Sequence, residues 1–287
     1  NDKGIWLTGD RNYILNNRIG TNPSGTQAVP NQIGVLIYNG IENIIGDENL
    51  ISGNVTGIII SSSYLETVQA NYIYGNLIGT VLAGNKALPN ETGINIIRGN
   101  GNRIGGNIPK KRNIISGNTG AGIKFSEANN NVVTGNFIGS DLSGEKALPN
   151  SIGIEFVGEP GSEFSFDNMI YDNLISGNKK DGVMLDYARG NSVVDNYIGT
   201  ATDGVSPLPN YGNGINIAHN TSNNCIGSRE PGKFNNIAFN KENGIFIKSS
   251  DSSREMPENN QILKNNIFRN KHSGLLLSKY ENLKSEK

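Results

Sequence analysis

The stretch IGTNPSGTQAVPN, residues Ile19–Asn31, decides the fold because close copies of it return three more times. The copies run from Ile78 to Asn90, from Ile138 to Asn150 and from Ile198 to Asn210, so their first residues are 59, 60 and 60 positions apart. A fixed period of this kind is typical of a repeat architecture, in which each unit stacks on the next. Most residues then serve the fold, and only departures from the repeat point to chemistry.

Each long repeat divides into two units of about 30 residues. A Gly-apolar-x-apolar tetrad opens every unit, as in Gly122–Phe125 and Gly214–Ile217. Apolar residues that alternate in this way predict a short strand with one buried face. No stretch keeps the i, i+3, i+4, i+7 apolar spacing of a helix for long. The tetrads begin at Gly4, Gly34, Gly57, Gly93, Gly122, Gly153, Gly182, Gly214, Gly244 and Gly274.

Two series of asparagines follow the tetrads through nine units. Asparagine is a poor strand residue unless its amide finds partners. Stacked units supply them, because a side-chain carbonyl can accept from the amide of the neighbouring unit, and the sequence therefore predicts two internal ladders. The first series is Asn12, Asn43, Asn71, Asn102, Asn131, Asn168, Asn191, Asn224 and Asn260. The second is Asn17, Asn49, Asn76, Asn113, Asn136, Asn173, Asn196, Asn235 and Asn265.

The repeated Ile-Gly-Thr stretch occurs only in every second unit. The units between carry Ile-Ser-Gly-Asn instead, as at Ile51–Asn54, Ile115–Asn118 and Ile175–Asn178. One flank of the molecule is therefore expected to bear loops on alternate coils, about 9.6 Å apart if neighbouring strands lie about 4.8 Å apart. The Pro-Asn that closes each loop fits a turn that re-enters the next coil.

Short strands, corner residues and stacked asparagines together resemble the right-handed parallel β-helix proteins of the pectin-lyase-like superfold. The resemblance extends from Gly4 to about Leu277. It implies an all-β, right-handed parallel β-helix of about ten coils, and right-handed crossovers also agree with the general rule for parallel strands. We expect a single domain over residues 1–278, followed by a polar C-terminal tail over residues 279–287.

Charge and composition argue against several classes of function. The net charge is −1 and the isoelectric point about 6.2, so the basic surface of a nucleic-acid-binding protein is missing. No apolar run approaches the roughly 20 residues of a membrane span. Cys225 is the only cysteine, which excludes an intrachain disulfide and a cysteine-based zinc site. No signal peptide is visible, whereas the resemblance implies an extracellular or cell-surface location.

Polar residues gather at two positions of the central units. The middle residue of each tetrad and the residue three positions later are both expected to face outward, and equivalent positions in adjacent coils lie about 5 Å apart. β-Helix polysaccharide lyases and uronate epimerases need a cation, a base and an acid at such a face. The candidate catalytic residues are Tyr187, His219, Arg98 and Lys124. The candidate substrate-binding residues are Glu127, Glu155, Asp186 and Asn216. The structural alternative is a solvated face with complementary charges on adjacent coils.

An apolar column is expected near the N-terminal end. Trp6, Leu36 and Ile59 take the outward position in successive units, with Tyr38 beside them. Trp6 and Tyr38 are therefore further candidates for sugar binding, because an aromatic ring can serve as a platform for a sugar. An exposed apolar column also fits self-association, or a preceding segment that covers it. We expect further domains or another copy of the chain beyond residue 1.

No metal or cofactor motif is present. The aspartates of the sixth and seventh units, which are Asp167, Asp172, Asp181, Asp186 and Asp195, do not recur as a set. Calcium could bind Asp141 and Asp203 in the repeated loops. However, Asn22 and Val81 at the corresponding positions are not carboxylates, so a turn-capping role is favoured. The Asp-Pro-His signature of alginate epimerase-like enzymes is also absent. The sequence predicts no cofactor and no metal site.

Three functions remain open at this point. The first is a carbohydrate-binding or adhesion module whose partner is a polysaccharide or a cell-surface glycan. The second is a polysaccharide lyase, uronate epimerase or glycoside hydrolase that uses the polar face of the fourth to eighth units. The third is a structural spacer or assembly unit. The regular repeat and the missing enzyme signatures favour the non-enzymatic functions.

Overall fold

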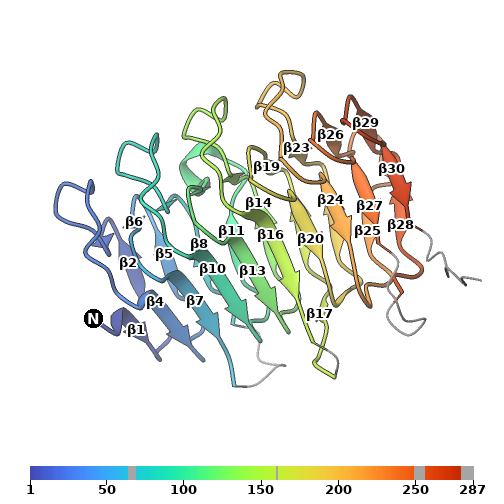
Figure 1. Cartoon of the computed structure of the whole chain (residues 1–287). Coiled ribbons are helices and arrows are strands. Elements are labelled where there is room, and N and C mark those ends of the chain that lie inside the picture. Colours follow the sequence, from blue (N-terminus) through green and yellow to red (C-terminus); the bar gives the residue numbers. More distant parts are fainter. Residues whose placement is uncertain (64–68, 160, 249–255, 279–287) are drawn as a thin grey trace, which may run out of the picture.

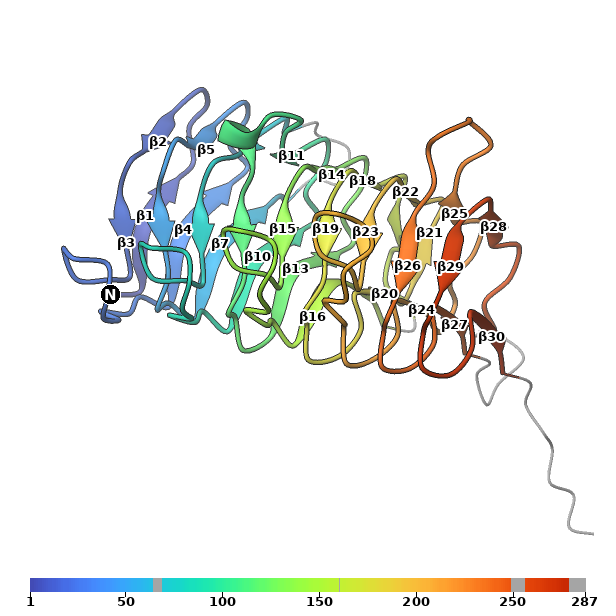
Figure 2. The ribbon, with the colours of Figure 1, turned by 90° about the horizontal axis from the view of Figure 1, so that it is seen from above.

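The computed structural model describes residues 1–63, 69–159, 161–248 and 256–278. Within them the chain winds into a stack of coils, and successive coils add strands to three long sheets (Figure 1 and Figure 2). Neighbouring strands of these sheets pair in parallel. The all-β, parallel β-helix prediction is confirmed. The expected tail over residues 279–287 lies outside the described residues.

Sheet A is built from the Gly-led tetrads. Its register confirms the predicted alignment of the middle tetrad residues, because Trp6 pairs with Leu36 and Lys124 pairs with Glu155. The residues on either side of each outward side chain face the interior, as the period of a strand requires. In spatial order the strands are β1 (Lys3–Leu7), β4 (Ile33–Tyr38), β7 (Thr56–Ser61), β10 (Thr92–Ile97), β13 (Ala121–Ser126), β16 (Ile152–Val157), β20 (Val183–Leu185), β24 (Ile215–Ile217), β27 (Ile245–Ile247) and β30 (Leu275–Leu277).

Sheets B and C complete each coil with two or three residues per strand. Sheet B comprises β2 (Tyr13–Leu15), β5 (Ile44–Gly46), β8 (Tyr72–Ile73), β11 (Arg103–Gly105), β14 (Val132–Thr134), β18 (Met169–Tyr171), β22 (Ser192–Val194), β25 (Cys225–Gly227) and β28 (Gln261–Leu263). Sheet C comprises β3 (Arg18–Ile19), β6 (Leu50–Ile51), β9 (Leu77–Ile78), β12 (Ile114–Ile115), β15 (Phe137–Ile138), β19 (Leu174–Ile175), β23 (Tyr197–Ile198), β26 (Asn236–Ala238) and β29 (Asn266–Phe268). A short pair joins β17 (Ser165–Phe166) to β21 (Ala188–Arg189), and one 3-10 turn, η1, spans Pro109–Lys111.

The core is a column of apolar side chains inside the coils. Ile94 and Ile123 are fully buried and in register on adjacent strands. The buried rings of Phe125 and Phe156 stack with centroids 4.6 Å apart. Fully burying a side chain of this size stabilises the fold by about 1.5–3 kcal/mol. Because every coil buries its apolar side against its neighbours, the chain needs no spherical core.

Three asparagine ladders run along the stack, where the sequence predicted two. In the predicted ladders Asn131 Nδ2 donates to Asn168 Oδ1 (2.9 Å), and Asn136 Nδ2 donates to Asn173 Oδ1 (3.0 Å). The third ladder joins the asparagines that close the loops and the Ser-Gly-Asn turns, and these bond along the stack as well as turning the chain. Its members are Asn31, Asn54, Asn90, Asn118, Asn150, Asn178, Asn210, Asn240 and Asn270.

The four repeated loops project from one flank on alternate coils, as predicted (Figure 1). An antiparallel bridge closes each of them, at Thr21–Ala28, Thr80–Ala87, Ser140–Ala147 and Thr200–Pro207. Successive loops also contact one another, since Leu82 N donates to Gly25 O (3.2 Å) and Leu142 N donates to Gly84 O (3.1 Å). The loops therefore form a second, smaller stack beside the coils.

Candidate functional site

On the polar face predicted on sheet A, charged side chains are paired between adjacent coils. Arg98 Nε lies 2.8 Å from Glu127 Oε2, and Lys124 Nζ lies 3.8 Å from Glu155 Oε2. Each cation is thus largely neutralised by the carboxylate next to it. A shallow cavity of about 410 Å³ opens beside Lys124 and Glu127.

The second half of the same face carries the predicted histidine. His219 Nδ1 lies 3.3 Å from Asp186 Oδ1, and Asn216 Nδ2 donates to Asp181 Oδ2 (2.9 Å). Tyr187, which the sequence places on this surface, is only 6 % exposed, because its ring stacks against Phe164 with centroids 6.3 Å apart. The structure therefore brings His219 and Asp186 together at the surface but covers the tyrosine ring.

The two aromatic candidates near the N-terminal end are exposed. Trp6 is 59 % exposed and Tyr38 is 40 % exposed, and Lys3 Nζ lies 5.0 Å from the centroid of the Trp6 ring. Leu36, which stands in register between Trp6 and Ile59, is only 9 % exposed. The expected continuous apolar column is therefore interrupted at Leu36.

The loop carboxylates cap turns. Asp203 Oδ1 accepts hydrogen bonds from Val205 N (2.9 Å) and Ser206 N (2.8 Å), and Asp141 Oδ1 accepts from Ser143 Oγ (2.6 Å). These contacts match the turn-capping role favoured by the sequence. Over the described part of the chain, no group of three or more His, Cys, Asp or Glu side chains is arranged to hold a metal ion.

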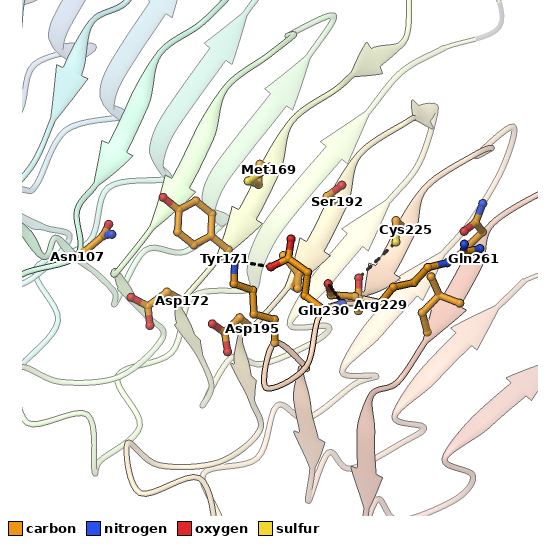
Figure 3. Close-up of a pocket in the computed structure, with 15 residues that line it drawn as sticks. Asn107, Met169, Tyr171, Asp172, Ser192, Asp195, Cys225, Arg229, Glu230 and Gln261 are labelled. Carbon is orange, nitrogen blue, oxygen red and sulfur yellow. Dashed lines mark hydrogen bonds and ion pairs between the residues drawn. The ribbon is translucent and has the colours of Figure 1, made fainter.

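A larger cavity lies elsewhere, on the outer face of sheet B, and we call it the sheet B trough (Figure 3). Its volume is about 810 Å³. Four successive strands, β18, β22, β25 and β28, provide its floor through outward-facing residues two positions apart. These are Met169, Tyr171, Ser192, Val194, Cys225, Gly227, Gln261 and Leu263. The floor thus combines a row that carries hydrogen-bonding groups, from Met169 to Gln261, with a mainly apolar row, from Tyr171 to Leu263.

Two segments outside the repeat form the walls of the trough. Asn107 precedes η1, and Arg103 Nη2 donates both to Asn107 Oδ1 (3.0 Å) and to Tyr171 Oη (3.3 Å). On the other side, the segment after β25 carries Glu230 and Lys233, whose side chains lie 2.8 Å apart. The Arg103 side chain thus connects Asn107 to the floor at Tyr171. The Glu230–Lys233 ion pair stabilises the second wall internally.

Two aspartates stand at one end of the trough. Asp172 and Asp195 follow β18 and β22, and Asp172 N donates to Asp195 O (2.8 Å), so they occupy adjacent coils (Figure 3). Both have a left-handed backbone, with φ of 56° and 58°. Among the residues that the structure describes, neither carboxylate accepts a hydrogen bond or lies within ion-pair distance of a cation. This distinguishes them from the paired charges of sheet A.

The electrostatic environment of Asp172 is unusual. Desolvation by its surroundings and, secondly, the nearby charge of Asp195 raise the pKa of the Asp172 carboxyl, and the positive charge of Arg112 opposes this shift. Arg112 is itself held over the Phe137 ring, 3.9 Å from its centroid, and burial lowers the pKa of its guanidinium. Perturbed carboxyl groups in clefts are candidates for functional sites.

The sequence carries a signal for this pair in the second asparagine series. Asp172 and Asp195 directly precede Asn173 and Asn196 of the second ladder, so they take the same position in consecutive units. Arg112 takes that position two units earlier, before Asn113. Alignment of the units on the ladder, rather than on the tetrads, would have placed these charges in one column.

The comparisons with known proteins bear on the fold. No protein-family model and no curated protein matches the chain. Among solved structures, a periplasmic alginate epimerase superposes with a TM-score of 0.53 at 15% identity, over 89% of this chain and 59% of the epimerase. The chain has the right-handed parallel β-helix fold. It spans about three fifths of the length of that epimerase.

Two further solved structures are similar at lower scores. An alginate lyase from Paenibacillus has a TM-score of 0.44 at 11% identity, over 93% of this chain and 99% of the lyase. Tailspike protein 2 of Escherichia coli O157:H7 bacteriophage CAB120 has a TM-score of 0.43 at 14% identity, over 95% of this chain and 38% of the tailspike. A search of the described residues for a helix long and apolar enough to cross a bilayer finds none.

Proposed function

We propose that this protein binds a polysaccharide chain along the sheet B trough, outside the cell. The observation that carries the proposal is the floor of the trough, where four successive strands each present two outward-facing residues at matching positions. A polymer of similar units suits a surface of similar steps about 4.8 Å apart. The cavity volume of about 810 Å³ is within the usual range for ligand sites, which combine apolar surface with a few polar groups.

The residues of the floor supply the contacts that a sugar needs. The Tyr171 ring and the Met169 side chain offer apolar surface, while Ser192 and Gln261 offer hydrogen-bonding groups two coils apart. The alginate epimerase that shares this fold is, by its name, a protein of polysaccharide metabolism. A glycan partner and an exported location for this chain agree with that likeness.

An enzyme that uses the sheet A face remains a second candidate, because one observation favours it. The carboxylate of Asp186 is placed to orient the imidazole of His219, which is a common arrangement for a general base. However, Glu127 and Glu155 already occupy Arg98 and Lys124, which a lyase or epimerase would use to neutralise a uronate. We therefore favour the sheet B trough over the sheet A face as the functional site.

Binding is tested with a panel of purified acidic and neutral polysaccharides, namely alginate, polygalacturonate, xylan and mannan, and their oligosaccharides. Isothermal titration calorimetry should detect at least one ligand. Tyr171→Ala should weaken its binding about tenfold, or about 1.4 kcal/mol, because the ring contributes apolar area to the floor. Ser192→Trp should abolish binding by filling the trough.

The matched control is Tyr13→Ala, which removes an exposed tyrosine from sheet B outside the trough. It should bind as the wild type does. Loss of binding in His219→Ala, together with unchanged binding in Ser192→Trp, would move the site to the sheet A face. The absence of any ligand in the panel would favour a structural spacer instead.

A further inference from the structure

The floor of the sheet B trough carries no group that is charged at neutral pH. Its eight residues have apolar, hydroxyl, amide or thiol side chains, or, at Gly227, none. Desolvation by burial raises the pKa of the Cys225 thiol, which keeps this group neutral. On sheet A, by contrast, Lys124 and Glu155 stand in register on the outer face. An anionic sugar on the floor of the trough would therefore meet no cation beneath it.

Most cations beside the trough already contact protein groups. Lys233 Nζ lies 2.8 Å from Glu230 Oε2, and Arg103 Nη2 donates to two protein acceptors at 3.0 Å and 3.3 Å. Arg229 lines the trough without lying within ion-pair distance of any acid that the structure describes. It stands at the end opposite the two aspartates (Figure 3). One guanidinium can hold one carboxylate of a ligand, but not a carboxylate on every sugar.

The other end of the trough is anionic. Asp172 and Asp195 line it from adjacent coils. Desolvation and then the charge of Asp195 raise the pKa of the Asp172 carboxyl, and the opposing charge of Arg112 does not cancel this shift. A carboxylate of a ligand placed here would meet the same repulsion. The trough as a whole is lined by three acids and two bases, so its formal charge is negative.

The two rows of the floor suit the surface of an uncharged sugar. One row offers the hydroxyl of Ser192 and the amide of Gln261, and the other offers the Tyr171 ring with Val194 and Leu263. The rows are two residues apart along each strand, or about 6.6 Å. A neutral pyranose has C–H groups on its faces and hydroxyl groups at its edges. It can therefore make apolar and hydrogen-bonding contacts side by side on this floor.

We infer that the sheet B trough selects a neutral polysaccharide and rejects polyuronates, which carry a carboxylate on every sugar. The inference rests on the proposed binding function and narrows it to a substrate class. A neutral chain needs no opposite charge, so it can lie along the floor and pass both ends of the trough. A polyuronate would lose hydration of its carboxylates over the floor without gaining a cation there. It would also face Asp172 and Asp195 at the anionic end.

The test compares neutral and acidic oligosaccharides of equal length on the intact chain by isothermal titration calorimetry. Mannan or xylan oligosaccharides should bind at least about 30-fold more tightly than alginate or polygalacturonate oligosaccharides, because like charges repel across an interface. The affinity for the neutral ligand should change less than about twofold between about 0.01 and 1 M salt, because salt screens only interactions between charges.

Two variants change the charge of the trough and should weaken this preference. Asp172→Asn combined with Asp195→Asn in one chain removes the anionic end and should lower the ratio of neutral to acidic affinity at least about fivefold. Glu230→Gln should lower the ratio in the same direction, because it releases Lys233 from its ion pair. Asp167→Asn is the matched control, since Asp167 also has a left-handed backbone (φ 53°) but lies outside the trough. It should keep the wild-type ratio.

The outcomes separate this inference from the binding function on which it rests. Tighter or equal binding of the polyuronates would overturn the substrate class and leave polysaccharide binding standing. An unchanged ratio in the double variant, or a loss of neutral binding at high salt, would also overturn it. Absence of binding to every polysaccharide would overturn both proposals.

Discussion

Asn136 illustrates what a ladder residue contributes. Its side chain is fully buried, and its Nδ2 donates to Ile104 O (3.0 Å) as well as to Asn173 Oδ1 (3.0 Å). Its Oδ1 accepts from both Asn113 N (3.3 Å) and Asn113 Nδ2 (2.8 Å). One side chain therefore joins three coils.

Asn136→Ala should lower the free energy of unfolding by about 3 kcal/mol, because each buried group left without a partner costs about 1–3 kcal/mol. Urea denaturation followed by circular dichroism measures the change. Asn266→Ala is the control, since it removes a single exposed bond, from Asn266 Nδ2 to Asn236 Oδ1. Equal effects of the two substitutions would mean that the ladder bonds contribute little.

At the scale of the element, the first glycine of the repeated loop is held by its neighbours. Gly139 has φ of 94°, and a Cβ placed there would lie 2.5 Å from Ser176 O and would collide with Asn178 Oδ1 of the third ladder. Gly161 has a similar φ of 89° but no atom within 4 Å of a Cβ at its position. Substitutions at the two positions therefore distinguish the energetic cost of backbone strain from that of steric conflict.

Gly161→Ala should cost about 1 kcal/mol, which is the strain of a residue with a side chain at positive φ. Gly139→Ala should cost about 3 kcal/mol or more, because the backbone or the ladder must also move. Thermal denaturation by differential scanning calorimetry compares the two variants with the wild type. If Gly139→Ala destabilised the protein no more than Gly161→Ala does, the loop would be less tightly packed against the next coil than the structure indicates.

The strands and ladders could be predicted because their residues repeat. Gly93 and Gly122 begin the same tetrad in adjacent coils, and Asn102 and Asn131 mark the same corner, so register follows from alignment of the units. The walls of the trough could not be predicted in this way. The segments around Asn107 and around Glu230 each interrupt one unit of the repeat. The repeat pattern therefore does not predict that they enclose one cavity.

At the scale of the whole molecule, most ion pairs between described residues link one coil to the next. Arg98 and Glu127 are 29 residues apart in sequence, and Arg11 and Glu42 are 31 residues apart. Exposed pairs of this kind contribute little each, but they define the charge pattern along the stack. Asp172 and Asp203 depart from that pattern, because neither forms an ion pair with any cation that the structure describes, and their pKa values shift in opposite directions.

The opposite pKa shifts of Asp172 and Asp203 predict opposite effects of pH on the free energy of unfolding. Desolvation raises the folded-state pKa of Asp172 above its ordinary value of 3.8, so its stabilising contribution is complete below that value and is lost as the pH rises through the folded-state pKa. The hydrogen bond from the Ser206 hydroxyl is the main cause that lowers the pKa of Asp203. Its contribution is present above the ordinary value and is lost as the pH falls through the folded-state pKa.

Asp172→Asn should therefore raise the melting temperature at neutral pH, and Asp203→Asn should lower it. The Asp172→Asn difference should shrink as the pH falls toward the ordinary carboxyl value of 3.8, whereas the Asp203→Asn difference should shrink only as the pH falls below that value, through the folded-state pKa of Asp203. Scanning calorimetry of the two variants and of Asp167→Asn over this pH interval measures the effect. A lower melting temperature for Asp172→Asn at neutral pH would show that its charge is stabilised in the fold. A higher one would mean that the molecule gives up stability to keep a carboxyl group at this position of its trough.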